Sequence, residues 1–180
     1  MSIEQEWRTA EESPNPWRVE QIFVDVNGVR VRLTPEGDMH ATEVVHAVQA
    51  RKMAMEVLRS LGFTQRLEDI ELILGEFTTN CIEHGDEIKE VDIDYDPDVL
   101  QIQTVNGVLV DTVLPSEERR GKLATDSADD EAEDGRGLML TEMLADEWRQ
   151  SIEGDRVVTY ARFGHIHRSN DTPLPPSQAA

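Results

Sequence analysis

The spacing of apolar residues changes several times along the chain, and each spacing predicts an element. Between residues 20 and 33 the apolar positions alternate on both sides of Asn27-Gly28, a strong signal for a two-residue turn. This segment is predicted to be a β-hairpin. Residues 42–61 carry apolar residues at helical spacing, and Gly62 follows as a typical helix C-cap. One helix is therefore expected after the hairpin.

The strongest helical pattern covers residues 67–84. Its apolar positions fall into one stripe along the helix, formed by Ile70, Ile73, Leu74, Phe77 and Cys81. Two strands are predicted next, at residues 90–95 and 99–106, around a turn that contains Pro97. The alternation in the second strand places every other side chain on a shared face.

The pattern weakens in the last third of the chain. Residues 115–134 show no apolar period, and their second half, residues 126–134, has six acids and no base, which indicates a mobile loop. Residues 138–147 have helical character with Trp148 at the end, and residues 156–163 alternate as a final strand.

The predicted order is strand, strand, helix, helix, strand, strand, loop, helix, strand. This order indicates an α+β fold, a two-layer sandwich in which helices cover one face of a mostly antiparallel sheet. We expect a folded domain over residues 20–163. Residues 1–19 lack an apolar period and are predicted to be a flexible N-terminal arm, and the Ser/Pro/Ala-rich residues 164–180 a disordered tail.

Composition excludes several classes of protein. The 180 residues include 17 Lys and Arg against 37 Asp and Glu, a formal net charge of −20. This charge opposes direct binding to nucleic acid or to anionic membranes, and it favours a basic protein partner. No apolar run approaches the roughly 18 residues of a membrane span, and no export signal is visible, so we expect a cytoplasmic protein. A single cysteine, Cys81, excludes an internal disulfide.

The helix predicted at residues 67–84 carries a polar stripe beside its apolar one. Glu76, Asn80 and His84 are spaced by four, so they follow one another along the same side of the helix. A carboxylate and an amide in this arrangement can serve as a general base and as a ligand for a metal ion or a phosphate. The spacing alone equally fits a solvated polar edge.

A glycine-rich turn opens the last predicted helix, at Asp134-Gly135-Arg136-Gly137-Leu138. Backbone N–H groups at the start of a helix can hold phosphate oxygens, and the helix dipole assists them. A Gly-x-Gly turn of this kind also occurs as a simple hinge.

With these two blocks in series, residues 71–85 and 134–148, the chain resembles the anti-sigma-factor serine/threonine kinases. This family belongs to the GHKL superfamily of histidine-kinase-like ATPases, which includes gyrase and the sensor histidine kinases. The first block is similar to the family's N-box and the second to its second glycine box. The resemblance extends over about residues 29–163 and implies a Bergerat-type ATP-binding fold that uses ATP and Mg²⁺.

The resemblance implies a role for each residue that matches a family motif. Glu76 matches the N-box general base, which takes the proton from a serine or threonine hydroxyl. Asn80 matches the asparagine that ligates Mg²⁺, and the Mg²⁺ bridges the nucleotide phosphates. His84 and Gly85 match the end of the N-box, beside the nucleotide.

The second block and the preceding helix are assigned in the same way. The turn of Gly135, Arg136, Gly137 and Leu138 matches the part of the family's site that faces the phosphates, and residues 115–134 occupy the position of the ATP lid. In the first helix, Arg51 stands where such anti-sigma proteins place an arginine that contacts partner proteins.

One position departs from the family pattern. The family places an aspartate at the end of the second central strand, where its carboxylate accepts a hydrogen bond from the adenine amino group. Alternation puts Asn106 at this position, followed by Gly107. An amide oxygen accepts the same bond but carries no charge, and charged acceptors bind about twice as strongly as neutral ones.

Two functions are compatible with this sequence. In the first, the protein is an anti-sigma factor that sequesters a sigma factor and phosphorylates a STAS-type anti-anti-sigma antagonist on Ser or Thr with Mg-ATP. A homodimer, as relatives form, is compatible with this function, and the sequence leaves the oligomeric state open. In the second, it is a regulator of the same fold that acts by binding alone, with ATP binding weakened or lost through Asn106.

Overall fold

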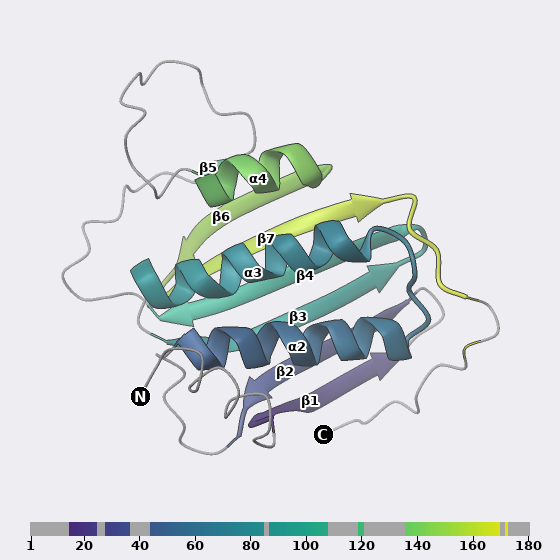
Figure 1. The fold of residues 1–180 in the computed structure, drawn as a ribbon, viewed down its shortest axis with the longest axis horizontal. Coiled ribbons are helices and arrows are strands. Elements are labelled where there is room, and N and C mark those ends of the chain that lie inside the picture. The colour runs from purple at the N-terminus through teal and green to yellow at the C-terminus, as the bar shows by residue number, and fades with distance from the viewer. Residues whose placement is uncertain are drawn as a thin grey trace, which may run out of the picture.

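The computed structural model describes residues 15–24, 28–36, 44–84, 87–107, 119–120, 136–169 and 172. Within these residues the strands form one seven-stranded sheet in the order β1-β2-β3-β4-β7-β6-β5, and all neighbouring strands are antiparallel (Figure 1). The strands are β1 (Trp17–Val24), β2 (Val29–Pro35), β3 (Ile88–Asp96), β4 (Val99–Gly107), β5 (Arg119–Arg120), β6 (Glu147–Glu153) and β7 (Arg156–Gly164).

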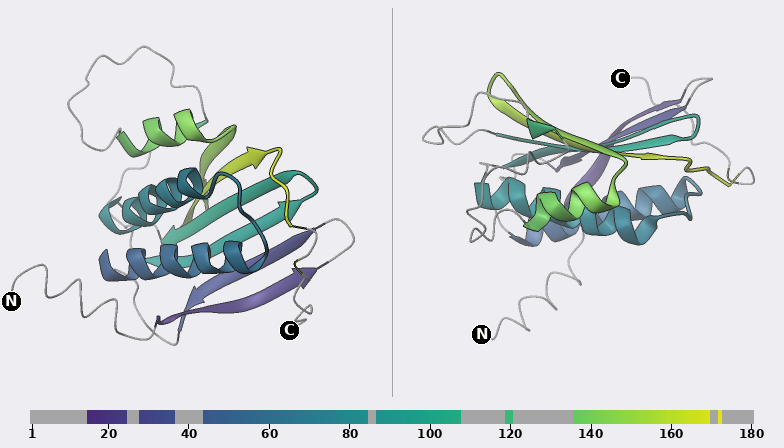
Figure 2. Two further views of the ribbon diagram at one scale, coloured as in Figure 1. Left: turned by 45° about the vertical axis from the view of Figure 1, so that its right-hand side comes forward. Right: turned by 90° about the horizontal axis from the view of Figure 1, so that it is seen from above.

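The described helices all lie on one face of this sheet. They are α2 (Val44–Ser60), α3 (Leu67–His84) and α4 (Arg136–Leu144). Figure 2 shows the helices and the sheet as two separate layers. The prediction of an α+β two-layer sandwich is therefore confirmed. None of the described helices has the length and apolar character needed to cross a membrane.

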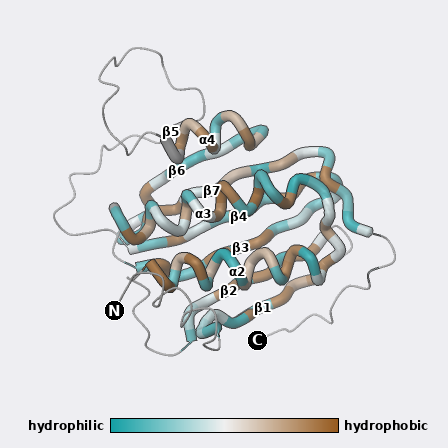
Figure 3. Tube along the Cα trace, viewed as in Figure 1, coloured by the Kyte–Doolittle hydropathy of each residue, from teal (hydrophilic) through white to brown (hydrophobic). Residues whose placement is uncertain are grey.

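One hydrophobic core lies between the two layers. Its strand side comes from alternate residues that point toward the helices, such as Ile93 in β3 and Ile102 in β4, which are fully buried. Figure 3 accordingly shows hydrophobic and hydrophilic stretches following one another along the helices and strands. The stripe predicted on α3 is buried against these strands, including Phe77 and Cys81.

The opposite face of the sheet is polar. Arg30 of β2 pairs with Asp94 of β3 at 2.5 Å, and Arg32 pairs with Asp92 at 2.9 Å. Polar side chains line a groove on this face, namely Arg30, Arg32, Asp92, Asp94, Gln101 and Gln103. Because both arginines already have carboxylate partners, this face is a solvated set of ion pairs, and such pairs contribute little to stability.

Most of the predicted elements are present, with ends that shift by a few residues. The helix at residues 67–84 has the predicted bounds. Gly62 adopts a φ of 87°, the left-handed conformation of a C-cap glycine, and Phe63 N–H donates to the Leu58 carbonyl oxygen at 3.1 Å. The C-cap prediction is therefore confirmed.

The prediction of a helix over residues 138–147 is wrong at its C-terminal end. The helix α4 stops at Leu144, and Trp148 lies in an unpredicted strand, β6. The helix-facing positions of β6 are Trp148, Gln150 and Ile152, so the apolar alternation is interrupted by a polar residue. Gln150 tolerates this position because its amide donates to the Thr159 hydroxyl oxygen at 3.1 Å.

The expected terminal segments also have different limits. The strand β1 begins within the expected arm of residues 1–19, because Trp17 is buried against the core. Asn15 precedes it and donates to the Gln49 carbonyl oxygen of α2 at 2.9 Å. At the other end, Gly164 belongs to β7 and Ile166 is buried, within the expected tail. Of the loop at 115–134, the described residues are those of β5; the rest lies outside them.

Candidate functional site

The two flanks of α3 face different neighbours. On one flank, Glu71 pairs with Arg59 of α2 at 3.8 Å. On the other, Asp69 pairs with Arg66 at 3.2 Å, and Arg66 also contacts Asp146, which follows α4, at 3.2 Å. The helix α3 therefore has an α2 flank and an α4 flank.

Glu76 and Asn80 lie on the α4 flank. They follow Asp69 by seven and eleven positions, which is about two and three full turns of an α-helix. Both side chains are half-buried, at the margin of the face that Phe77 and Cys81 bury. The stripe predicted from the spacing of four thus borders the space between α3 and α4 and is not a fully exposed edge.

The sheet beneath this part of α3 changes from apolar to polar. Along β4, the helix-facing positions Leu100 and Ile102 are followed by Thr104 and Asn106. Thr104 pairs in register with Thr159 of β7. All three polar residues are buried, with exposed fractions of 0% for Thr104 and 5% each for Asn106 and Thr159. The apolar core therefore ends in a polar floor, which we define as Thr104, Asn106 and Thr159.

Asn106 connects this floor to α3. The Cys81 thiol donates a hydrogen bond to the Asn106 amide oxygen, with an Sγ–Oδ1 distance of 3.4 Å. The amide nitrogen of Asn106 donates to the carbonyl oxygen of Gly107 at 2.9 Å. Because Cys81 directly follows Asn80 in α3, the amide lies next to the stripe of Glu76 and Asn80.

Burial keeps the Cys81 thiol protonated. It raises the pKa of Cys81 from its ordinary value of 9.0 to about 12, and the neighbouring Thr104 hydroxyl opposes this rise in part. A protonated thiol can donate, so its contact with the oxygen of Asn106 has a defined direction. It is also a poor nucleophile, which agrees with the interpretation of Cys81 as a buried small hydrophobe.

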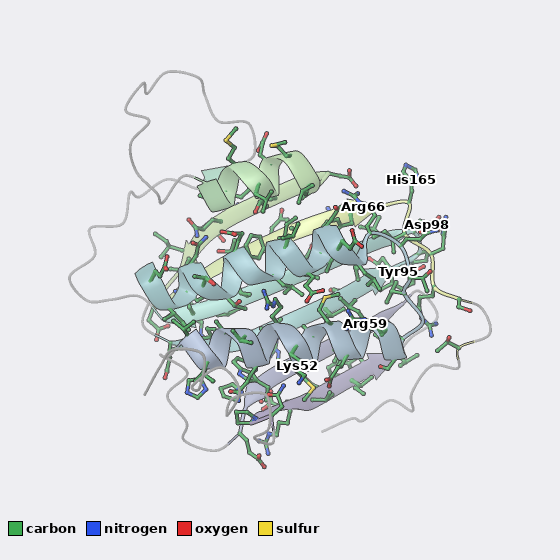
Figure 4. The ribbon with its side chains drawn as sticks, in the orientation of Figure 1. Lys52, Arg59, Arg66, Tyr95, Asp98 and His165 are labelled. Carbon is green, nitrogen blue, oxygen red and sulfur yellow. The ribbon has the colours of Figure 1, made fainter. Side chains whose placement is uncertain are left out.

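Hydrogen bonds hold the C-terminal half of α4 in place. The Arg66 guanidinium donates to the carbonyl oxygen of Leu144 and lies 5.0 Å from the centre of the Phe163 ring. The indole N–H of Trp148 donates to Glu142 at 2.5 Å. Figure 4 shows Arg66 near the first turn of α3, at the end of the molecule away from the first residues of α4. The opposite, N-terminal end of α4 lies toward the C-terminal half of α3, whose last turn extends past it (Figure 1).

The remaining predicted nucleotide residues are only partly placed. The helix α4 begins at Arg136, within the glycine-rich segment of residues 134–138. Leu138, in the first turn of α4, packs against the core. Gly137 lies in the backbone of α4 and His84 in that of α3, but the side chains of His84 and Arg136 are outside the described residues. Gly85 and Gly135 lie outside them altogether.

Arg51 lies on the other flank of α3. Its guanidinium crosses Gly75, and a Cβ atom added to Gly75 would lie 3.2 Å from Nη1 of Arg51. Gly75 follows Glu71 by four positions, so both belong to the α2 flank. The structure therefore places Arg51 on the α2 flank and Glu76 and Asn80 on the α4 flank, and the expected contact of Arg51 with partner proteins stays a prediction.

The donor set suits a magnesium ion held mainly by a nucleotide. Among the described residues, no three His, Cys, Asp or Glu side chains are grouped as a metal site would require. Mg²⁺ is commonly bound through one or two protein ligands together with substrate phosphates. An amide oxygen from Asn80, on the α4 flank of α3, fits this mode.

Several residues of the site were not found from the sequence. Thr159 belongs to the polar floor only because the register of β4 and β7 brings it beside Thr104. The contact of Cys81 with Asn106 likewise joins residues 25 positions apart. The sequence indicates this polar floor only through Thr104, a polar residue at a helix-facing position of a predicted strand.

Comparison with known families agrees with this arrangement. The model of a family described as the histidine kinase-like ATPase domain matches residues 40–162, more than half of the chain. The matched range includes α2, α3 and β4 and ends within β7, and the hairpin of β1 and β2 lies before it. The comparison with curated proteins gives no match.

Proposed function

Because the chain belongs to the histidine kinase-like ATPase domain family, we propose that it binds Mg-ATP between α3 and α4 and acts as an anti-sigma factor of the serine-kinase type. Its partners in this proposal are a sigma factor, which it sequesters, and a STAS-type anti-anti-sigma antagonist, which it phosphorylates on Ser or Thr. The observation that carries the proposal is the position of Glu76 and Asn80 on the α4 flank, above the polar floor.

Each part of the proposed site supplies one component of phosphoryl transfer. The N–H groups in the first turn of α4 would hold phosphate oxygens, and the amide oxygen of Asn80 would hold a magnesium ion, which would supply positive charge against the phosphates. Glu76 accepts the proton of the antagonist's hydroxyl as its oxygen bonds to the γ-phosphorus, and ADP leaves.

Charge supports a protein partner that is basic. The formal net charge of −20 attracts a DNA-binding protein such as a sigma factor. In this proposal Arg51 contacts the partner from the α2 flank, and the nucleotide binds on the α4 flank. A homodimer, as relatives form, is part of the same proposal.

Nucleotide binding is tested first, by titration calorimetry with Mg²⁺. The wild-type protein should release or absorb heat with millimolar ATP, and Asn80→Ala should weaken binding in the presence of Mg²⁺. Gln101→Ala is the matched control, because this amide lies on the opposite face of the sheet. Absence of any wild-type heat would refute the nucleotide site.

Phosphoryl transfer requires a separate assay with the antagonist. Glu76→Gln should keep ATP affinity while transfer slows by about 10² to 10⁴, the usual contribution of a general base. The Glu68→Gln variant, changed at an exposed position of the same helix, should transfer the phosphoryl group at the normal rate.

Partner identity is tested by a pull-down with and without ATP, in which a sigma factor should be captured.

The contacts of Asn106 favour a second candidate, a regulator that acts by binding alone. The oxygen that could accept from adenine already accepts from Cys81, and it carries no formal charge. If this is why ATP binds weakly, Asn106→Asp should raise ATP affinity and leave partner binding unchanged. An unchanged ATP affinity in this variant would remove the reason for the second candidate.

A further inference from the structure

The helix α2 exposes a group of valines at its N-terminal end. Val44 is 53% exposed, and Val45 and Val48 are half-buried. None of the three belongs to the hydrophobic core or to the side chains that pack against it. Figure 1 shows α3 along one flank of α2 and, among the described helices, none along the other. The described part of the structure therefore leaves this apolar surface of α2 uncovered.

Cations without partners lie beside the valines. The helix α2 holds Arg51, Lys52 and Arg59 against one acid, Glu56, a net charge of +2 in a chain of net charge −20. Arg59 pairs with a carboxylate of α3, whereas neither Arg51 nor Lys52 forms an ion pair or a side-chain hydrogen bond within the described residues. Both follow Val48 by three or four positions, which places them on its side of the helix. We define the outer face of α2 as Val44, Val45, Val48, Arg51 and Lys52.

The chain enters the fold at the edge of this outer face. The side chain of Asn15 donates to the Gln49 carbonyl oxygen at 2.9 Å, and its oxygen accepts from the Trp17 N–H at 3.0 Å. Gln49 lies four positions after Val45 and three before Lys52, so these residues are neighbours on the surface of α2. Asn15 thus holds the end of the N-terminal segment, residues 1–14, beside the outer face.

The N-terminal segment complements the outer face in charge and in apolar character. Its side chains carry four acids and one base, a net charge of −3, together with the apolar residues Ile3 and Trp7. The acids are Glu4, Glu6, Glu11 and Glu12. Fourteen extended residues reach about 46 Å, whereas the 17 residues of α2 span only about 26 Å. The segment is therefore long enough to cover the outer face from its attachment at Asn15.

We propose that the N-terminal segment docks on the outer face of α2, with its acids at Arg51 and Lys52 and with Trp7 on the valines. Exposed ion pairs are weak, but a tethered segment has an effective concentration in the millimolar range. A millimolar affinity consequently keeps it docked for about half of the time. Because Arg51 is expected to contact partner proteins, a partner would have to displace the segment. This consequence rests on the proposed function, whereas the docking itself does not.

The test is a zero-length cross-link between Lys52 and the acids of the N-terminal segment. A carbodiimide joins an amine to a carboxylate only where the two meet, and the chain has three lysines, Lys52, Lys89 and Lys122. Mass spectrometry of the whole chain should find the segment linked to Lys52 at several times the yield at Lys89, after correction for the reactivity of each amine toward acetylation. Equal yields, or links from Lys52 to Asp38 or Glu43 instead, would overturn the proposal.

The cross-link must also form within one molecule. In a mixture of ¹⁵N-labelled and unlabelled protein, the two linked peptides should both be labelled or both be unlabelled. Mixed pairs would assign the outer face to a second copy of the chain and would overturn the proposal. No nucleotide or partner takes part in these measurements, so their outcome is independent of the proposed function.

Variants test the contacts one by one. Arg51→Gln should lower the yield of the Lys52 cross-link about two- to fivefold, the effect of losing one exposed ion pair. Trp7→Ala should lower the yield as well, because the valines then lose their apolar contact. Arg30→Gln removes a guanidinium on the open face of the sheet and should leave the yield unchanged. Equal yields in the wild type, Arg51→Gln and Trp7→Ala would refute the docking.

Discussion

At the scale of single residues, Cys81 gives the protein a defined response to alkaline pH. Its pKa is about 12 in the folded protein and about 9 when exposed, so between these values the unfolded chain has lost a proton that the folded chain keeps. The contribution of this thiol to stability is therefore complete below pH 9 and falls as the pH rises above it, by at most about 1.4 kcal/mol per pH unit.

The measurement compares wild-type protein with Cys81→Ala by urea denaturation between pH 8 and pH 10.5. The wild type should lose more free energy of unfolding over this range, because lysines and tyrosines titrate equally in both proteins. Equal losses would show that the thiol is not buried as described. In the same range the native thiol should resist alkylation, which a labelling time course checks.

Gly75 is a second residue with a predictable effect. Alanine at a helix-interior position is favoured over glycine by up to about 1 kcal/mol, and the group it would meet is the mobile end of Arg51, at 3.2 Å. Gly75→Ala should therefore raise the free energy of unfolding while it displaces the guanidinium. If Arg51 contacts the partner, this variant should also weaken partner binding, whereas Lys52→Ala should not. A loss of stability would contradict the prediction.

At the scale of elements, Arg66 determines how α4 is attached. One side chain donates to Leu144, pairs with Asp146 and lies on the ring of Phe163. Arg66→Ala should lower the free energy of unfolding by about 2 kcal/mol, because a partly buried carbonyl loses a charged donor. Arg59→Ala is the control, since its ion pair with Glu71 is exposed and should be worth less than about 1 kcal/mol.

The same scale shows what the sequence could and could not predict. The helix α3 was predictable because its apolar period and its polar stripe are both local. The strand β6 was missed because Gln150 interrupts its alternation and is satisfied only by Thr159 on the neighbouring strand. For the site, spacing and family resemblance indicated Glu76 and Asn80, whereas the contact between Asn106 and Cys81 joins two elements and has no local signal.

At the scale of the whole molecule, the sequence concentrates negative charge in one segment. On the open sheet face, by contrast, arginines pair with acids, as in Arg30–Asp94 and Arg162–Glu147. Six acids without a base are concentrated in residues 126–134. This segment should dominate the long-range attraction of a basic partner.

The association rate with the partner should consequently fall as salt rises, because the Debye length shortens from about 10 Å at 0.1 M to about 3 Å at 1 M. Replacing the six acids of residues 126–134 with Asn and Gln should reduce this salt dependence, measured by stopped-flow mixing at several ionic strengths. Asp94→Asn, which removes a charge that Arg30 already balances, should change it much less. Salt screens electrostatic attraction over these distances, so steering by the acids requires an association rate that depends on salt. A rate that stays constant across salt concentrations would assign the acids another role, such as solubility.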